Sequence, residues 1–308
     1  MIKNKLKLVL PHIYDEYQHI IRKKNIKTAN RYKNMPFEEQ VQLLESMYLE
    51  KIGHSLDWNN LRSYTEKMQW EKMYNHDPKK IVLADKYAVR DWVIEKIGEE
   101  YLIPLIGVWE KVTDINFNTL PDRFVLKTNN GTGTNLIVKD KSILNIRETK
   151  RVLDDWLKTD YGYLNGFEIH YSKISPKIIA EKYIETWDGD LQDYKFLCFG
   201  GKPYFCWVDK GRYSNHTRNV YDLEWNLQPW NQSTKGNYEK EIPKPDNFSE
   251  MVAIAEKLCA DFAQVRVDLY NVDGKIYFGE MTFTNGRGFD PIVPEEYDYV
   301  LGDLWIIE

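Results

Sequence analysis

The sequence predicts an α+β protein, and three observations support this fold class. In the first part of the chain, apolar residues recur at spacings of three and four, which is typical of amphipathic helices. In the second part, apolar and polar residues alternate in short runs, which is typical of strands. Glycine-containing turns separate several of these runs, so we expect antiparallel hairpins. With 308 residues, of which 43% are hydrophobic, the chain can form one large or two modest domains.

Composition and charge exclude several classes of protein. No apolar run is long enough to span a bilayer, and the opening MIKNKLKLVLP lacks a signal-peptide cleavage site, so we expect a soluble, cytoplasmic protein. The three cysteines lack metal-ligand spacing, which predicts buried thiols. The net charge of −5 and the lack of a recognisable binding motif argue against a nucleic-acid partner.

Positive charge is concentrated at the start of the chain. Residues 1–34 contain nine basic and two acidic residues. This basic arm could contact an anionic membrane surface, which would make the protein peripheral to the inner face of a membrane. A solvated helix face is the alternative.

Helices are expected in the first hundred residues and in one later segment. The spacing from Pro36 to Met73 predicts helices without evident chemistry. A further helix is expected within Ile81–Leu102, with Asp85 as its N-cap and Tyr87 on its buried side. The segment Arg147–Lys158 predicts another.

The segment Asp122–Lys139, DRFVLKTNNGTGTNLIVK, predicts two strands around a glycine-rich loop. Backbone N–H groups of such a loop can bind phosphates, and Lys127 adds a positive charge on the first strand. It is not a P-loop, because the GxxxxGK[ST] order is missing. Since turns need glycine in any case, an ordinary hairpin remains possible. Further strands are expected at Ile178–Ile184 and in a hairpin that carries Lys195.

The segment Gln264–Asp290 predicts a hairpin that turns at Asp273-Gly274. Pairing across this turn would bring Asp268 close to Glu280. Carboxylates held this close repel each other unless a cation lies between them, and magnesium bound with a nucleotide fits such ligands. The alternative is a solvated hairpin whose acidic residues face water. The polar loop after Glu280 is suited to anion contacts.

The order of these residues resembles the ATP-grasp superfamily. Within it, the sequence is similar to the group associated with teichuronopeptide and capsular polysaccharide biosynthesis. The resemblance covers about Asn60 to Trp305 and rests on four segments: DKYAVRDWVIEKIGEEYLIPLIGVW, FVLKTNNGTGTN, DYKFLCFGGKP and VRVDLYNVDGKIYFGEMTFTNGRGF.

The resemblance implies two α+β lobes that clasp ATP, preceded by an N-terminal helical extension. We expect a helical region at 1–78 with the basic arm, and a catalytic domain at 79–308. Within that domain we expect a lead-in at 79–120, a lid lobe at 121–187 and a metal-binding lobe at 188–308.

The resemblance also implies a role for each matching residue. The ATP phosphates would be contacted by Lys86, Lys127 and the loop Gly131, Thr132 and Gly133. The adenine edge would lie along Glu181, Lys182, Tyr183 and Ile184, and Lys195 would contact a phosphate or the adenine. Asp268 and Glu280 would hold one or two Mg²⁺ ions, and Arg266 would face the γ-phosphate or an acyl-phosphate. Thr282 stands where many ATP-grasp enzymes have an asparagine ligand, which weakens the case for a second metal ion.

The implied function is a carboxylate–amine ligase that uses ATP and forms an acyl-phosphate. We expect it to join an amino acid or small amine to a uronic acid of a cell-surface polysaccharide or its precursor. A fork of guanidinium N–H groups suits a carboxylate, so we expect Arg212, with Arg218 or Arg287, to orient the uronic acid. The alternatives are a sugar or polyol kinase and a non-catalytic nucleotide-binding protein.

Overall fold

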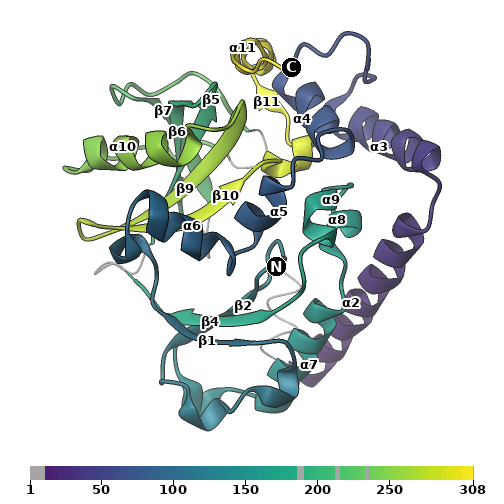
Figure 1. Ribbon diagram of the computed structural model, residues 1–308, viewed down its shortest axis with the longest axis vertical. Helices are drawn as coiled ribbons and strands as arrows, with labels where there is room; N and C mark the ends of the chain where they lie inside the picture. The colour runs from purple at the N-terminus through teal and green to yellow at the C-terminus, as the bar shows by residue number, and fades with distance from the viewer. Residues whose placement is uncertain (1–10, 186–190, 212–215, 233–235, 308) are drawn as a thin grey trace. The chain divides into compact units, whose positions relative to one another are not determined.

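The computed structural model describes residues 11–185, 191–211, 216–232 and 236–307 (Figure 1). The chain divides into two compact units that are interleaved in sequence. Unit 1 is built from the described part of Met1–Gln40 with Asp85–Tyr87 and Pro104–Tyr183, and unit 2 from the described parts of Val41–Ala84, Ala88–Ile103 and Ile184–Glu308. The expected lid lobe therefore falls almost wholly in unit 1 and the expected metal-binding lobe in unit 2.

Unit 1 is organised around a four-stranded antiparallel sheet in the order β1-β4-β2-β3. One face of this sheet forms an apolar core with α7 and the turns that precede β2. Helix α7 begins at an asparagine cap, since the side chain of Asn145 accepts a hydrogen bond from the Glu148 backbone N–H. The strands are β1 (Leu105–Trp109), β2 (Phe124–Thr128), β3 (Asn135–Val138) and β4 (Ile178–Lys182). The helices are α2 (Pro11–Lys33), α7 (Ile146–Leu157), α8 (Tyr161–Leu164) and α9 (Ile169–Ser172), with short turns at η2 (Val112–Asp114), η3 (Phe117–Thr119) and η4 (Lys141–Ile143).

Unit 2 is organised around a five-stranded antiparallel sheet in the order β10-β9-β5-β6-β7. Helix α10 covers one face (Figure 1), where Phe196 stacks on Phe248. The strands are β5 (Asp193–Phe199), β6 (Lys202–Lys210), β7 (Thr217–Asp222), β9 (Gln264–Val272) and β10 (Lys275–Thr282), with a small pair β8 (Asn231–Gln232) and β11 (Ile292–Val293). The helices are α4 (Tyr64–Met73), α5 (Lys79–Ala84), α6 (Val89–Lys96), α10 (Phe248–Cys259) and α11 (Glu296–Leu304). Short turns lie at η1 (Glu99–Tyr101) and η5 (Asn285–Gly288). The boundary between the units falls within α3 (Phe37–Ile52).

The second face of this sheet packs, over part of its area, against α4 and α11. A buried cluster joins Tyr64 and Met68 of α4 to Leu301 of α11 and to the side chains of β5 and β6. The start of α4 is fixed by a capping box between Ser63 and Glu66. The rest of this face carries charged residues, which are described below.

The expected hairpins are confirmed. Asp273 and Gly274 both have positive φ, 52° and 89°, as the tight turn requires. Strand β4 and helix α7 also lie where the sequence predicted them, and all three cysteines are free and buried.

The expected helix within Ile81–Leu102 is wrong in its details. It is divided into α5 and α6, and Tyr87 is exposed rather than buried. Asp85 does not cap α6, which begins at Val89. Its carboxylate instead accepts hydrogen bonds from the Tyr87 backbone N–H (2.8 Å) and from the side chain of Asn129 (2.9 Å). The hydrogen bond between Asp85 and Asn129 thus lies at the point where the helix is interrupted, between α5 and α6.

The described part of the basic arm is helix α2. His19, Arg22 and Lys23 all contact the buried carboxylate of Asp155 on α7, at 2.6, 2.9 and 3.3 Å. Two of the basic residues counted in the arm, Arg22 and Lys23, therefore bind a buried carboxylate within unit 1. Among the described residues, no helix is both long and apolar enough to cross a membrane.

The close packing of α11 on the segment before α4 predicts the effect of one substitution. A Cβ atom added at Gly302 would overlap the backbone carbonyl oxygen of Arg62. We expect Gly302→Ala to lower the free energy of unfolding by about 1–3 kcal/mol, the usual cost of overpacking. Val300→Ala, at an exposed position of the same helix, should change it by no more than about 0.5 kcal/mol. Urea unfolding of the two variants checks this; equal effects would show that α11 does not pack as described.

Candidate active site

The candidate site in unit 2 is built on the β9–β10 hairpin. Asp268 pairs directly with Glu280, as the sequence predicted. Asp268 is one residue closer to the turn than Glu280, so this pairing requires an extra residue in β10, and a bulge at Gly279 supplies it. Without the bulge, Glu280 would point to the opposite face of the sheet.

The cation between these two carboxylates is the guanidinium of Arg266. It donates to both oxygens of Asp268 at 2.6 Å and to Glu280 Oε1 at 3.3 Å. It also donates to Thr282 Oγ1 at 3.1 Å and to Asn285 Oδ1. We expected Arg266 to face a phosphate, and the structure shows it fully engaged with the side chains around it.

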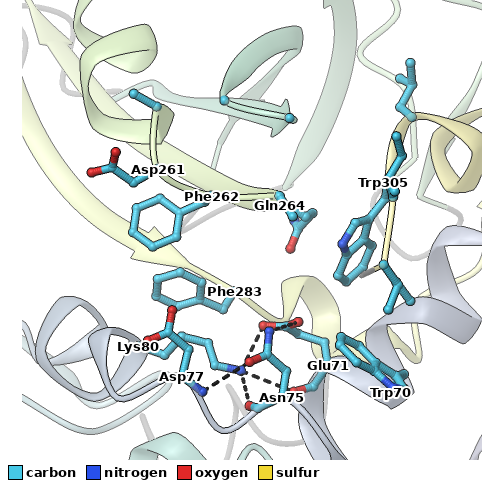
Figure 2. A pocket seen from close by; sticks show the side chains of 17 residues that line it. Trp70, Glu71, Asn75, Asp77, Lys80, Asp261, Phe262, Gln264, Phe283 and Trp305 are labelled. Carbon is cyan, nitrogen blue, oxygen red and sulfur yellow. Dashed lines mark hydrogen bonds and ion pairs between the residues drawn. The ribbon is translucent and has the colours of Figure 1, made fainter.

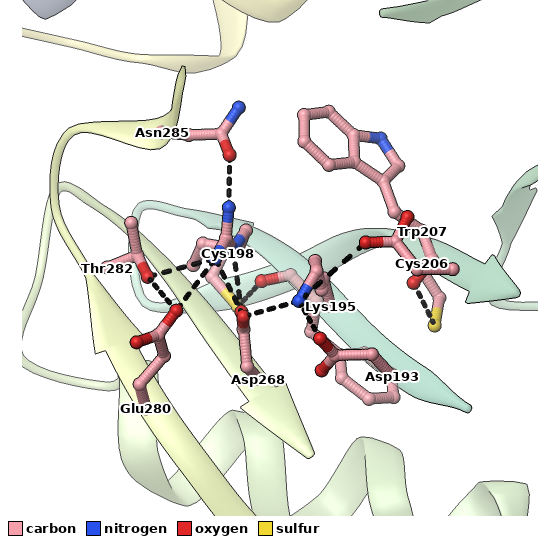
Figure 3. Close-up of polar contacts among 12 residues, drawn as sticks. Asp193, Lys195, Cys198, Cys206, Trp207, Asp268, Glu280, Thr282 and Asn285 are labelled. Atoms are coloured by element: carbon pink, nitrogen blue, oxygen red, sulfur yellow. Dashed lines mark hydrogen bonds and ion pairs between the residues drawn. The ribbon is translucent and has the colours of Figure 1, made fainter. Parts of the chain in front are cut away.

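The charged cluster continues across the sheet (Figure 3). Lys195 on β5 donates to Asp268 Oδ2 at 2.8 Å and to Asp193. Its Nζ also lies 3.9 Å from Asp209 on β6, which in turn binds Arg218 on β7 through two hydrogen bonds of 2.6 and 2.9 Å. Cations and carboxylates thus alternate across all five strands on one face.

Burial and pairing act in opposite directions on these groups. The pKa of Asp268 is raised, mainly by burial. Arg266 and Lys195 lower this pKa, whereas the nearby carboxylates of Asp193 and Glu280 raise it further. Burial would also raise the pKa of Asp209, but Arg218, His216 and Lys195 outweigh it and hold that pKa below its usual value. Burial lowers the pKa of Arg266, but the negative charge of Asp268 outweighs burial, so the pKa is raised.

The two carboxylates of the hairpin differ in access to a ligand. Asp268 is 2% exposed and both its oxygens are bound, whereas Glu280 is 34% exposed. Two carboxylates with the Thr282 hydroxyl form a hard oxygen donor set that fits Mg²⁺, with Glu280 as its open member. No group of three or more His, Cys, Asp or Glu side chains gathers as a metal site within the described ranges. Any further ligands would therefore come from water or substrate.

Unit 1 carries a second group of predicted residues on β2, β4 and the loop between β2 and β3. Lys127 lies on the face of β2 that points away from the apolar core, and its ammonium binds the buried carboxylate of Glu181 at 2.6 Å. Lys86 donates to the carbonyl of Gly131 at 3.0 Å, and its backbone N–H donates to Asn129. The structure therefore brings both lysines to the glycine-rich loop or the strands beside it.

The shape of this loop depends on Gly131. A Cβ atom there would overlap the hydroxyls of Thr128 and Thr134, which are hydrogen-bonded to each other at 2.8 Å. Gly133 has a φ of 72° and open space around it, and Thr132 is exposed. The loop thus has two exposed residues, Thr132 and Gly133, and the residues beside them, Gly131 and Thr134, are buried.

The residues expected along the adenine edge are only partly in a strand. Strand β4 ends at Lys182, which is exposed. Tyr183 follows, with the guanidinium of Arg123 at 4.4 Å and the ammonium of Lys139 at 5.7 Å from its ring. Ile184 is half-buried beyond the strand end.

Comparison with known proteins decides the family. The family described as TupA-like ATPgrasp matches residues 66–306. The chain belongs to the TupA-like ATP-grasp family. A search of curated proteins finds no match.

Solved structures give a more distant likeness. A D-alanine–D-alanine ligase from Bacillus anthracis is 21% identical, with a TM-score of 0.39, over 66% of this chain and 57% of the ligase. The enzyme of the same title from Helicobacter pylori is 11% identical, with a TM-score of 0.40, over 73% and 62%. A RimK domain ATP-grasp protein from Sphaerobacter thermophilus is 12% identical, with a TM-score of 0.40, over 74% and 68%. The chain thus spans just under two thirds or less of the length of these D-alanine–D-alanine ligases.

In this TupA-like ATP-grasp chain, the arginines expected at the acceptor have different surroundings. Arg212 lies outside the described residues. Arg218 is buried and fully used by Asp209, Gln232 and the ring of Trp207, which is 4.4 Å away. Arg287 is exposed, with a φ of 61°, and its carbonyl accepts a hydrogen bond from Lys72.

Sequence reasoning missed two asparagines that support these groups. Asn285 is buried and binds Arg266, while its Nδ2 has no hydrogen-bond partner among the described residues. Asn129 links Asp85 to the backbone of Ser175 and Lys177. Both lie in polar loops that the sequence marked as functional, but nothing in the spacing distinguishes them from their neighbours.

The pair of Asp209 with Arg218 predicts a pH dependence of stability. A carboxyl group whose pKa is lowered on folding stabilises the protein above the pKa of the unfolded state, about 3.9, and this contribution is lost as the pH falls. Asp209→Asn leaves a buried guanidinium without its counter-ion and should cost about 3–5 kcal/mol at pH 7.

Urea unfolding at several pH values measures this difference. The gap between wild type and Asp209→Asn should be fully present at about pH 5 and should shrink below about 4. A gap that stays constant into strongly acidic solution would contradict the ionised pair.

Proposed function

We propose that this protein is an ATP-dependent carboxylate–amine ligase. One substrate carboxylate oxygen attacks the γ-phosphorus of ATP, which gives an acyl-phosphate and releases ADP. An amine then attacks the acyl carbon, inorganic phosphate leaves, and the nitrogen loses a proton to form the amide. The observation that carries the proposal is the Arg266–Asp268–Glu280 cluster in a chain of the TupA-like ATP-grasp family.

The chemistry of phosphoryl transfer suits the groups of both units. Charge develops on the transferring phosphoryl, and fixed cations stabilise it without reorganisation. In unit 2, Arg266 and Lys195 are held by several hydrogen bonds each. In unit 1, Lys86 and Lys127 lie beside a loop whose exposed tip can contact phosphates through backbone N–H groups.

Magnesium would be held by Glu280, Asp268 and the hydroxyl of Thr282. When bound, it would neutralise phosphate charge. Asp268 would reach it by exchanging one of its bonds to Arg266 or Lys195. If Arg266 gave up one of its two hydrogen bonds to Asp268, it would have an N–H group to donate to the phosphoryl oxygens.

We propose that the carboxylate substrate is a uronic acid of a cell-surface polysaccharide or its precursor, and that the amine is an amino acid or another small amine. Arg287 is the described arginine best suited to orient the carboxylate, because Arg218 is saturated by Asp209. Lys24, Lys27 and Arg31 are exposed on α2. They would bring the enzyme to the anionic inner face of a membrane if the polysaccharide is lipid-linked.

Product analysis tests the proposed reaction. The protein is incubated with ATP, a uronic-acid oligosaccharide and a panel of amino acids and amines. We expect amide, ADP and phosphate in equal amounts. A phosphorylated sugar would identify a kinase, and nucleotide binding without turnover would identify a non-catalytic protein; either result would overturn the ligase.

Replacement of Glu280 tests the metal assignment. Glu280→Gln removes one ligand charge at nearly constant volume, so turnover should fall at least about tenfold, or about 1.4 kcal/mol of transition-state stabilisation. Glu256→Gln, an exposed change on α10, is the control and should leave turnover unchanged. Glu280→Gln with wild-type turnover and an unchanged magnesium requirement would remove Glu280 from the metal site.

Replacement of Lys127 tests the nucleotide site of unit 1. Lys127→Met removes the ammonium and keeps an apolar stem, so the Kd for ATP, measured by calorimetry, should rise about tenfold because a charge-assisted hydrogen bond is lost. Lys158→Met removes an exposed ion pair with Asp154 on α7 and should have no effect. Equal ATP affinity in both variants would place the phosphates elsewhere.

A further inference from the structure

A separate pocket of about 660 Å³ lies wholly within unit 2 (Figure 2). One of its lining residues, Gln264, is two residues before Arg266 of the charged cluster. Its walls come from α4 and the segment after it, from the link between α10 and β9, and from the end of the chain. The rings of Phe262 and Phe283 lie on one side, and those of Trp70 and Trp305 on the other. None of the predicted site residues that the structure describes lines it.

A buried side chain without a complete set of partners points into this pocket. Gln264 on β9 is 4% exposed. Its Nε2 donates to the hydroxyl of Tyr64 at 3.3 Å, while its Oε1 has no hydrogen-bond partner in the part of the chain that the structure describes. A buried carbonyl oxygen without a hydrogen-bond partner is unfavourable, so this atom is an acceptor for an N–H or O–H group of a ligand.

The other polar side chains of the pocket favour a cationic ligand. Its described lining carries the carboxylates of Glu71, Asp77 and Asp261 against the single ammonium of Lys80. That ammonium is already used, because it donates to Glu71 Oε1 (2.9 Å) and to the carbonyls of Glu71 and Asn75. Asp261 also lies 3.4 Å from the ammonium of Lys96. Asp77 is therefore the lining carboxylate with no ion pair among the described residues, and indole rings also attract cations.

We propose that this pocket binds the amine co-substrate, a primary ammonium on an apolar body. The ammonium donates to Gln264 Oε1, and the body packs against Trp70 and Trp305. It loses one proton to water before the neutral amine attacks the acyl carbon, and the second proton leaves as the amide forms. Gln264 and Arg266 lie on the same face of β9, two residues and therefore about 7 Å apart. The amine end is thus held close to the cluster that we assign to phosphoryl transfer, so the inference rests on the proposed function.

Direct binding tests the pocket without any turnover. Hexylamine, hexanol and hexanoate share one apolar chain and differ in the head group. In calorimetric titrations of the full chain, hexylamine should bind at least about tenfold more tightly than hexanol, and hexanoate should not bind, because charged hydrogen bonds and the acidic lining favour only the ammonium. Equal affinity for hexanoate would overturn the proposal.

Two variants assign the binding to this pocket. Gln264→Leu removes the acceptor at similar volume, and Asp77→Asn removes a carboxylate while keeping an oxygen for the Lys79 N–H that it now accepts. Each should weaken hexylamine binding about tenfold. Gln228→Leu is the matched control, since Gln228 lies in the turn after β7 and does not line the pocket. Unchanged affinity in both folded variants would contradict the assignment.

A ligase assay separates this inference from the proposed function. Gln264→Leu should raise the KM for the amine about tenfold and leave the KM for ATP unchanged. Normal turnover with no effect of Gln264→Leu on the amine KM would reject the pocket and keep the ligase. Hexylamine binding that depends on Gln264, without turnover on any carboxylate, would reject the ligase and keep an amine-binding pocket.

Discussion

The ion pair between Arg266 and Asp268 is the interaction on which the site depends. Both side chains are buried on one face of a sheet, where an isolated charge would be very unfavourable. Two parallel hydrogen bonds of 2.6 Å satisfy the pair, and its remaining donors and acceptors go to Glu280, Thr282, Asn285 and Lys195. Loss of either partner would leave the other charge unpaired, at a cost of about 3–5 kcal/mol. The pair therefore requires the neighbouring strands to keep their register.

The same hydrogen bonds fix the positions of the charged groups relative to one another. The alternation of β9 directs Val265 and Val267 to the face that α10 covers, and Arg266 and Asp268 to the other. Next to the charged groups, α4 and α11 close the sheet with a packed aromatic cluster. A preorganised set of cations and carboxylates is what electrostatic catalysis needs. Of the two hairpin carboxylates, Glu280 is the partly exposed one, so a ligand would reach the cluster from its side.

The sequence predicted the hairpins and β4, because alternation, tight-turn dipeptides and glycine loops are local signals. It did not predict β7, β8 or β11. It placed Asp268 opposite Glu280, although the pairing depends on a bulge at Gly279 that no local signal marks. Partners were harder to predict, because the pairing of Lys127 with Glu181 and the division of the helix at Asp85 arise from contacts between segments distant in sequence. The unpaired Oε1 of Gln264 can be recognised only when its surroundings are known in three dimensions.

The central claim is that the buried cluster serves transfer of a phosphoryl group to a carboxylate. Isotope transfer tests it most directly: the uronic-acid carboxylate is labelled with ¹⁸O, and the phosphate released during turnover with ATP and amine is analysed by mass spectrometry. An acyl-phosphate mechanism predicts one ¹⁸O atom in each phosphate released, because the carboxylate oxygen that attacks phosphorus leaves with it. Release of unlabelled phosphate during turnover of ATP would contradict the account.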